Sequence, residues 1–392
     1  MKTLTVLGST GSIGVNTLDV VRCQPDRFQV YGLAAGENVE RLSGQIQEFH
    51  PSEVVVATDT ARARLRERLP ELGLSRASWP ELSFGPEALV RIGAASEVDT
   101  VISAIVGVAG LEATYEAIQA KKRVGLANKE VLVSAGSLVM EAARQSGAEL
   151  IPVDSEHNGV HQCLRAGNRT EVTRLILTAS GGPFRNMEAG EMAKATPAQA
   201  LNHPTWKMGN RITVDSATLM NKGFEVIEAC WLFGFMPAQV DVVIHPQSTV
   251  HAMIEMIDGS VLAQMSTTDM RMPIQYALTW PDRSAAPVPK LDWSESRTWE
   301  FSAPDWQRFP LLKLAYRCQE AGGSATCVLN AADEVAVEAF LQERIPFGGI
   351  AQVVEETLQR FPSRRPGAIA DVLDIDKEAR SLARQLLVPV SA

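Results

Sequence analysis

Five polar residues follow a short apolar stretch in IPVDSEHNGV, residues 151–160. Two carboxylates, a hydroxyl, an imidazole and an amide stand in a row: Asp154, Ser155, Glu156, His157 and Asn158. Residues i and i+2 of an extended backbone face the same way, so Asp154 and Glu156 can converge on one point. Carboxylates that close must share a proton or bind a cation, and oxygen-only ligands suit Mg²⁺ or Mn²⁺. A solvated acidic loop is the alternative.

A second polar run, VDSATLMNKGFEVIEACWLFG (214–234), contains Ser216, Asn221, Lys222 and Glu225. A helix that begins near Gly223 would have Glu225 in its first turn. Serine, asparagine and lysine side chains are suitable donors to a phosphate, and Glu225 is a plausible third carboxylate for the metal. The alternative is a charged helix start, where the helix dipole favours a glutamate.

Three further segments contain candidate ligand-binding groups. LANKE places Lys129 and Glu130 just after an apolar stretch, and TASGGPF (178–184) offers Ser180 before two glycines as a candidate phosphate loop. In NHPTWKMGNR (202–211), Trp206 and Met208 lie in an otherwise polar stretch, which indicates a lid that closes over substrate. Static packing of that segment between domains is equally compatible with the pattern.

The elements expected to position these groups alternate along the first 150 residues. Helical stretches separate apolar strand candidates at 3–7, 28–34, 53–57, 99–104, 123–127 and 149–153. This alternation predicts a Rossmann-like α/β domain, with a doubly wound parallel sheet covered on both faces. Ligands of such sheets bind beyond the carboxyl ends of the strands, which is where the polar groups of LANKE and PVDSEHN fall.

The first strand leads into a glycine-rich turn and a helix in LTVLGSTGSIGVNTLDVV (4–21). Gly8, Gly11 and Gly14 permit a tight turn and close approach of a pyrophosphate, and the helix N-terminus offers free N–H groups. A glycine turn without a ligand is the alternative. The second strand ends at Ala34-Ala35-Gly36, with room for a 2′-phosphate, but Glu37 could instead bind the ribose 2′-hydroxyl of NAD. These residues leave the choice of nucleotide open.

The rest of the chain predicts two further parts. Asp258-Gly259 between 250–257 and 260–265 predicts a hairpin, within a central α/β domain that has a mixed sheet. After a Pro- and Trp-containing connector, residues 310–388 have the periodicity of three or four helices. We expect a nucleotide-binding domain at 1–150, a catalytic and dimerisation domain at 151–285, a linker at 286–310 and a C-terminal helical bundle at 311–392.

Composition excludes some partners. The 392 residues carry a net charge of −9, which argues against nucleic acid or an anionic membrane surface. Five scattered cysteines without a C-x-x-C spacing are typical of free thiols in a reducing cytoplasm. No apolar run is long enough to span a membrane.

Taken together, these segments resemble the 1-deoxy-D-xylulose 5-phosphate reductoisomerase family. The matching segments, in the family's order, are GSTGSIG, LANKE, PVDSEHN, SGGPF, HPTWKMG, VDSATLMNKGFE, HPQS and LNAADEVAV. The resemblance implies a homodimeric enzyme that rearranges and reduces 1-deoxy-D-xylulose 5-phosphate to 2-C-methyl-D-erythritol 4-phosphate. It implies NADPH as the reductant and a divalent metal, Mg²⁺ or Mn²⁺.

The resemblance also assigns roles to residues. The nucleotide contacts would be Thr10, Gly11, Ser12, Ile13, Gly36, Asn38, Asn128, Glu130 and Gly209, with Glu37 where many members have a basic residue. The metal ligands would be Asp154, Glu156 and Glu225. The substrate contacts would be Lys129, Ser155, Glu156, Ser180, His203, Ser216, Asn221, Lys222 and Glu225. Trp206 and Met208 would lie in the lid.

Two other functions are compatible with parts of the sequence. A simple NAD(P)-dependent dehydrogenase of a phosphorylated small substrate explains residues 1–150 but leaves the three carboxylates unused. A nucleotide-sensing protein without turnover explains the glycine loop, but the intact set of Lys129, Asp154, Glu156 and Glu225 argues against it.

Overall fold

The computed structural model describes residues 1–206 and 208–387. Contacts divide the chain into two compact units. Unit 1 comprises Met1–Val131, Val139–Asn158 and Asp269–Pro289. Unit 2 comprises Leu132–Leu138, Gly159–Thr268 and the described residues from Lys290 onward. Residues 151–158 and 269–289 therefore pack with the N-terminal segment, while the expected four-part functional division stays a prediction.

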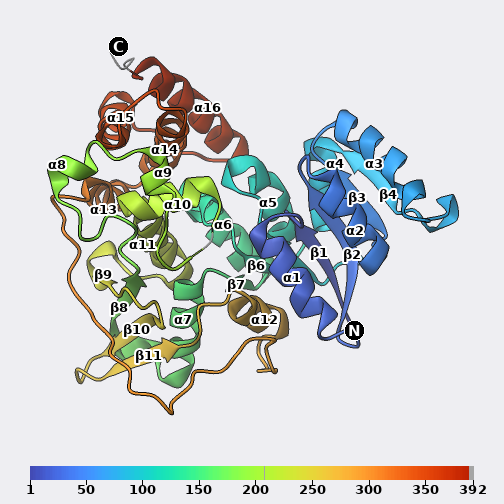
Figure 1. Ribbon diagram of the computed structural model, residues 1–392, viewed down its shortest axis with the longest axis horizontal. Coiled ribbons are helices and arrows are strands. Elements are labelled where there is room, and N and C mark those ends of the chain that lie inside the picture. The colour runs from blue at the N-terminus through green and yellow to red at the C-terminus, as the bar shows by residue number, and fades with distance from the viewer. Residues whose placement is uncertain (207, 388–392) are drawn as a thin grey trace. The chain divides into compact units, whose positions relative to one another are not determined.

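Unit 1 contains a parallel sheet with strand order β4-β3-β2-β1-β5-β6-β7 (Figure 1). Its strands are β1 (Lys2–Leu7), β2 (Phe28–Ala35), β3 (Glu53–Val56), β4 (Glu81–Phe84), β5 (Thr100–Ser103), β6 (Arg123–Leu126) and β7 (Leu150–Pro152). Its helices are α1 (Ser12–Arg22), α2 (Val39–Phe49), α3 (Asp59–Glu71), α4 (Gly85–Ala94), α5 (Leu111–Gln119) and α12 (Arg271–Thr279). The order reverses between β1 and β5, so ligands are expected at the carboxyl ends of these two strands. The expected doubly wound parallel sheet is confirmed.

The strands of unit 1 form where the apolar runs predicted them, because strands buried on both faces read as near-continuous apolar runs. β3 and β5 are completely buried. β4 has no counterpart among the expected strands. It is an edge strand whose residues are all at least partly exposed, so no buried apolar run marks it.

Unit 2 contains a mixed sheet with strand order β11-β10-β8-β9. Its strands are β8 (Val172–Ala179), β9 (Val240–Ile244), β10 (Val250–Met256) and β11 (Val261–Met265). β8 and β9 are parallel, whereas β10 is antiparallel to both β8 and β11. The expected hairpin is confirmed as β10–β11. Gly259 has φ +84° at its turn, and the side chain of Asp258 accepts a hydrogen bond from the N–H of Ser260 at 2.9 Å.

Helices make up most of the rest of unit 2. They are α8 (Ala189–Met192), α9 (Pro197–Ala200), α10 (Asn210–Thr218), α11 (Met220–Phe233), α13 (Pro310–Ala321), α14 (Ala325–Leu341), α15 (Phe347–Arg360) and α16 (Ile369–Gln385). Residues of α6 (Glu130–Ser146) and α7 (Ser155–Cys163) belong to both units. Short 3₁₀ turns lie at Arg76–Ser78, Gly107–Gly110, Leu164–Ala166, Arg169–Glu171 and Pro237–Gln239. Helices α13 to α16 confirm the C-terminal bundle.

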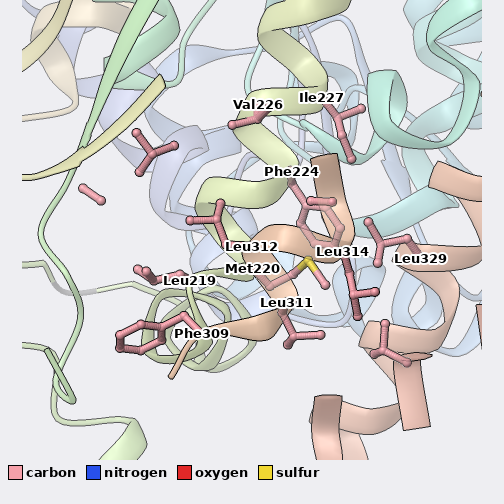
Figure 2. Packing of buried hydrophobic residues seen from close by; sticks show 14 of the residues in the cluster. Leu219, Met220, Phe224, Val226, Ile227, Phe309, Leu311, Leu312, Leu314 and Leu329 are labelled. Atoms are coloured by element: carbon pink, nitrogen blue, oxygen red, sulfur yellow. The ribbon is translucent and has the colours of Figure 1, made fainter. Parts of the chain in front are cut away.

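The core of unit 2 forms where α11 packs against the C-terminal helices. Figure 2 shows side chains of α11 meeting those of α13 and α14, among them Phe224, Ile227, Leu311, Leu314 and Leu329. Gly223 lets α11 approach α13 closely, because a Cβ there would lie 2.7 Å from the Cβ of Ala315. No helix in residues 1–206 or 208–387 is long and apolar enough to cross a membrane.

Candidate functional site

The glycine turn after β1 has the geometry of a phosphate-binding loop. Gly8 has φ +93°, and a Cβ there would lie 2.5 Å from the carbonyl oxygen of Ala104. A Cβ on Gly14 would lie 2.3 Å from the carbonyl oxygen of Gly8, so the turn can close only with glycine at both positions. No side chain caps α1, whose first N–H groups face the turn and suit a pyrophosphate.

Asn128 and Glu130 brace a second turn at the carboxyl edge of the same sheet. The side-chain amide of Asn128 donates to the carbonyl oxygen of Gly107 at 2.9 Å, and Glu130 accepts from the N–H of Gly107 at 3.2 Å. Gly107 has φ +73°, in the turn that follows β5. These two candidate nucleotide contacts therefore hold the turn next to the strand-order reversal.

The segment that follows β2 carries both an acidic residue, Glu37, and a basic residue, Arg41. Glu37 accepts a hydrogen bond from the hydroxyl of Thr58 at 2.8 Å, and its other carboxylate oxygen lies 3.9 Å from Nη1 of Arg64. Asn38 caps α2. Arg41, which our sequence analysis did not single out, donates from Nη1 to the carbonyl oxygen of Thr10 at 2.9 Å. Its position in the first turn of α2, just after the second strand, could have marked it as a candidate nucleotide contact.

Asp154 and its neighbours differ from the sequence expectation in backbone conformation. α7 begins at Ser155, so Asp154 precedes a helix and Glu156 lies in its first turn. The extended backbone assumed for the Asp154–Glu156 pair is therefore wrong. The sequence expectation placed Asp154 and Glu156 in extended backbone just after a strand ending at residue 153, but their polar groups satisfy a helix start. The N–H of Glu156 points toward Oδ1 of Asp154, 3.4 Å away.

Lys129 is the close partner of Asp154 in unit 1. Its Nζ lies 2.6 Å from Oδ2 of Asp154, and the two side chains are 7% and 14% exposed. Ser155 donates to Glu156 at 2.5 Å. Of the remaining polar members of the motif, His157 is buried with its Nδ1 3.7 Å from Oδ1 of Asp154, and the amide of Asn158 donates to the carbonyl oxygen of Pro152 at 2.8 Å.

In unit 2, the helix that carries Glu225 begins earlier than expected. α11 starts at Met220, so Glu225 lies in its second turn rather than its first. Asn221 donates to Oε1 of Glu225 at 2.6 Å, and Nζ of Lys222 lies 2.5 Å from Oε2. Lys222 and Glu225 are 3% and 1% exposed, so this ion pair is almost completely removed from solvent.

Ser180 and His203 form a second polar group in unit 2. Nε2 of His203 lies 3.0 Å from the hydroxyl of Ser180, while Nδ1 accepts from the N–H groups of Thr205 and Trp206 at 3.1 and 2.8 Å. Burial and the nearby charge of Arg185 lower the pKa of His203, so the ring is neutral. With Nδ1 as an acceptor, the proton sits on Nε2 and points at Ser180.

The glycines after Ser180 fix its position against α10. Gly182 has φ +66°, and a Cβ there would lie 2.6 Å from the carbonyl oxygen of Ser216. The turn at 180–182 therefore packs directly on the helix that carries Ser216, which is itself 8% exposed. Two candidate substrate contacts that are 36 residues apart in sequence are thus joined through backbone.

The expected lid segment leads into α10. Trp206 and Met208 are half-buried, and Gly209 is the residue before the first turn of α10. Residue 207 lies outside the described residues. Movement of this segment stays a prediction.

His245 and His251 have structural roles in unit 2. Nδ1 of His245 lies 3.0 Å from the carbonyl oxygen of Glu300, and Nε2 accepts from two backbone N–H groups. His251, on β10, contacts Ser266 at 3.0 Å, and burial lowers its pKa to about 4.

Three family models match the chain. Residues 4–136 match 1-deoxy-D-xylulose 5-phosphate reductoisomerase, residues 150–233 match its C-terminal domain, and residues 265–382 match a model described as DXP reductoisomerase C-terminal domain. The reductoisomerase of Solibacter usitatus is 69% identical over 386 residues, covering 98% of this chain and 97% of the relative. The chain belongs to the 1-deoxy-D-xylulose 5-phosphate reductoisomerase family.

Other members of the reductoisomerase family match in sequence and structure. The enzyme of Dechloromonas aromatica is 50% identical over 392 residues, covering 99% of this chain and 98% of the relative. The Zymomonas mobilis reductoisomerase in complex with NADPH superimposes with a TM-score of 0.92 at 44% identity, covering 99% and 100% of the two chains. A reductoisomerase structure with NADPH, fosmidomycin and magnesium gives 0.91 at 40%, covering 98% of each chain. The family expected from the sequence is confirmed.

Proposed function

We propose that this chain catalyses the reaction of its family, the rearrangement and reduction of 1-deoxy-D-xylulose 5-phosphate to 2-C-methyl-D-erythritol 4-phosphate. The sequence match to reductoisomerases over almost the whole chain carries the proposal. The reductant is NADPH and the metal is Mg²⁺ or Mn²⁺; NADPH and magnesium are named for structures similar to this one. The reaction forms a precursor of isoprenoids by the non-mevalonate route.

The residues present fit both groups. The glycine turn has no space for side chains at Gly8 and Gly14 and leaves helix N–H groups for a pyrophosphate. Asp154, Glu156 and Glu225 offer carboxylate oxygens only, which suits a hard divalent ion rather than zinc or copper. When bound, the ion stabilises negative charge on the substrate's oxygens, and NADPH supplies the hydride.

Lys129 and Asp154 act as a unit in this proposal. The lysine provides the counter-charge for a carboxylate that is almost buried, and each fixes the position of the other. Lys129 also offers a donor to a substrate oxygen, because its ammonium carries three N–H groups.

The substrate phosphate is assigned to donors in unit 2. Ser180, Ser216, Asn221 and Lys222 supply hydroxyl, amide and ammonium donors, and His203 adds an N–H from a neutral ring. Lys222 and Asn221 hold Glu225 in this structure. A bound phosphate gives both donors a second anionic acceptor, which leaves the carboxylate of Glu225 available to a cation.

We propose for the nucleotide contacts and the metal ligands the same residues that the family resemblance implies, and a lid that contains Trp206 and Met208. The four-part domain division is proposed likewise.

A reducing cytoplasm is the proposed location, supported by five cysteines that are all free thiols. A homodimer is proposed through the hairpin, because β11 is an edge strand of its sheet and such a strand can pair with a second copy. Sedimentation of the chain, and of a variant with proline at Ala263, would test the dimer.

The function is tested by following nicotinamide absorbance with 1-deoxy-D-xylulose 5-phosphate, with and without a chelator. We expect NADPH oxidation that stops with chelator and returns with Mn²⁺. Glu225→Gln should keep the fold and lose most of the metal-dependent turnover at limiting Mn²⁺. Unchanged turnover in that variant would contradict the three-carboxylate site. NADPH oxidation that is indifferent to chelator would favour a simple dehydrogenase.

A further inference from the structure

Glu37 follows β2, the strand end at which a Rossmann-like domain binds the adenosine ribose, and its carboxylate is already engaged. Thr58 donates to one of its oxygens at 2.8 Å, and the guanidinium of Arg64 lies 3.9 Å from the other. Both Glu37 and Arg64 are more than half exposed, and their charges cancel. The pair therefore neither repels an incoming phosphate strongly nor attracts it.

Arg41 differs from Arg64 because its guanidinium lies against a neutral acceptor and not against a carboxylate. It lies in the first turn of α2, where its N–H is capped by Asn38 at 3.1 Å. Its guanidinium reaches back to the glycine turn and donates to the carbonyl oxygen of Thr10 at 2.9 Å. That acceptor is neutral, and within residues 1–206 and 208–387 no carboxylate forms an ion pair with Arg41.

Neighbouring arginines do not share this property. Arg62 pairs with Asp59 at 2.6 Å, and Arg68 pairs with Glu40 at 2.8 Å and with Glu71 at 2.5 Å. Among these arginines of the described residues, Arg41 is thus the one whose positive charge no carboxylate compensates. A guanidinium has five donors in a planar fork, so most of them remain available for an anion.

The chain that follows β2 leaves open space for a phosphate. A Cβ on Gly36 would meet no atom within 4 Å, and the residues before it, Ala34 and Ala35, are small. We propose that Arg41 recognises the adenosine 2′-phosphate of NADPH, from α2, in place of a basic side chain at position 37. Arginine is suited to this role because its fork can donate two parallel hydrogen bonds to one phosphate. The inference rests on the proposed use of NADPH.

The competing role for Arg41 is purely structural, as a clamp on the glycine turn through Thr10. The two roles differ in what they do to NADH, which has the same pyrophosphate but no 2′-phosphate. If Arg41 only holds the glycine turn, it strengthens the binding of NADPH and NADH equally. If Arg41 binds the 2′-phosphate, it strengthens the binding of NADPH alone.

The test measures dissociation constants of the full-length protein by calorimetry for NADPH, NADH, adenosine 2′,5′-bisphosphate and 5′-AMP. In Arg41→Gln, the two ligands with a 2′-phosphate should bind roughly 10- to 100-fold more weakly, and the other two should change by less than about twofold. Arg41→Lys should recover part of the loss. Arg66→Gln is the matched control, since it removes another exposed arginine, on α3, and should change none of the four.

Equal losses for NADPH and NADH in Arg41→Gln would overturn the inference in favour of the clamp. An Arg41→Gln variant that keeps the wild-type preference for NADPH over NADH would also overturn the inference. A wild-type protein that does not prefer NADPH would contradict the proposed cofactor, and the role of Arg41 with it. The wild-type measurement therefore separates a failure of the proposed function from a failure of the inference alone.

Discussion

Replacing Asp333 with asparagine should stabilise the protein at neutral pH. Asp333, in LNAADEVAV on α14, is completely buried, and its oxygens accept no hydrogen bond from an N–H or hydroxyl donor of the described residues. Its charged neighbours are Asp215 and Arg211 on α10 and Glu334 on α14, with Nη2 of Arg211 3.7 Å away. Burial, followed by the charge of Asp215, raises the pKa of Asp333 well above 3.8.

The sign of the pH dependence follows from the raised pKa. Between about pH 4 and the folded-state pKa, the folded protein holds a proton on Asp333 that the unfolded chain has lost. Stability from this group is therefore present at low pH and decreases as pH rises, by about 1.4 kcal/mol per pH unit in that window. The side chain of asparagine is neutral at every pH, so it avoids placing a buried negative charge beside Asp215.

We expect Asp333→Asn to exceed the wild type by roughly 1–3 kcal/mol in free energy of unfolding at pH 8, the cost of an unsatisfied buried polar group. The advantage should be smaller at pH 5. Urea unfolding at both pH values, followed by far-UV circular dichroism, measures it, provided that the urea dependence is the same for both proteins. A variant that is less stable at pH 8, or an advantage independent of pH, would refute the reasoning.

The neighbouring Glu334 is the matched control, with the opposite expectation. Burial raises its pKa, but the hydrogen bond from Arg380 and the charges of Arg211 and Arg380 outweigh burial, so the net pKa is lowered. Nη1 of Arg211 lies 3.0 Å and Nη2 of Arg380 2.8 Å from Glu334. Stability from Glu334 is present above pH 4.5 and is lost as pH falls through its folded pKa. Glu334→Gln should therefore lose about 2 kcal/mol at both pH 5 and pH 8.

Two further predictions concern ligands. In a variant that retains Trp206 as its sole tryptophan, the tryptophan fluorescence should change when a phosphonate analogue of the substrate binds, because the segment 202–211 closes. A constant signal at saturating analogue would favour static packing of that segment. Glu37→Lys should widen the NADPH advantage over NADH in kcat/KM by roughly five- to tenfold, because it replaces the anion of the Glu37–Arg64 pair with a cation and leaves Arg64 uncompensated, an exposed charge effect of about 1 kcal/mol. A wild-type preference for NADH would instead show that Glu37 binds the ribose hydroxyl.

The fold was predictable where a local pattern dictates the structure. Apolar runs mark the buried strands of unit 1, and Asp258-Gly259 marks the hairpin because a tight turn needs a positive φ. The glycine turn is equally local, since Gly8 and Gly14 have no space for a side chain. β4 was not predictable, because an exposed edge strand leaves no apolar run.

Helix starts at the site were less predictable. Polar residues after an apolar run are compatible with a continuing strand or with a helix, and the helix at Ser155 depends on tertiary packing that buries His157 and Asn158. Contacts between distant residues left no local signal. The pairs Arg41–Thr10 and Asp215–Asp333 connect different elements, so no spacing in the sequence indicates them.

Both units place a lysine against a carboxylate that is proposed as a metal ligand. Lys129 contacts Asp154, and Lys222 contacts Glu225, each at hydrogen-bonding distance and almost buried. A buried carboxylate without a counter-charge costs several kcal/mol, so the lysines stabilise these sites before any ligand binds. The same lysines compete with a cation for the carboxylate oxygens. A substrate phosphate relieves that competition at Lys222, because it offers the ammonium another anion. Metal and substrate should therefore strengthen each other's binding, by reciprocal coupling through the Lys222–Glu225 pair.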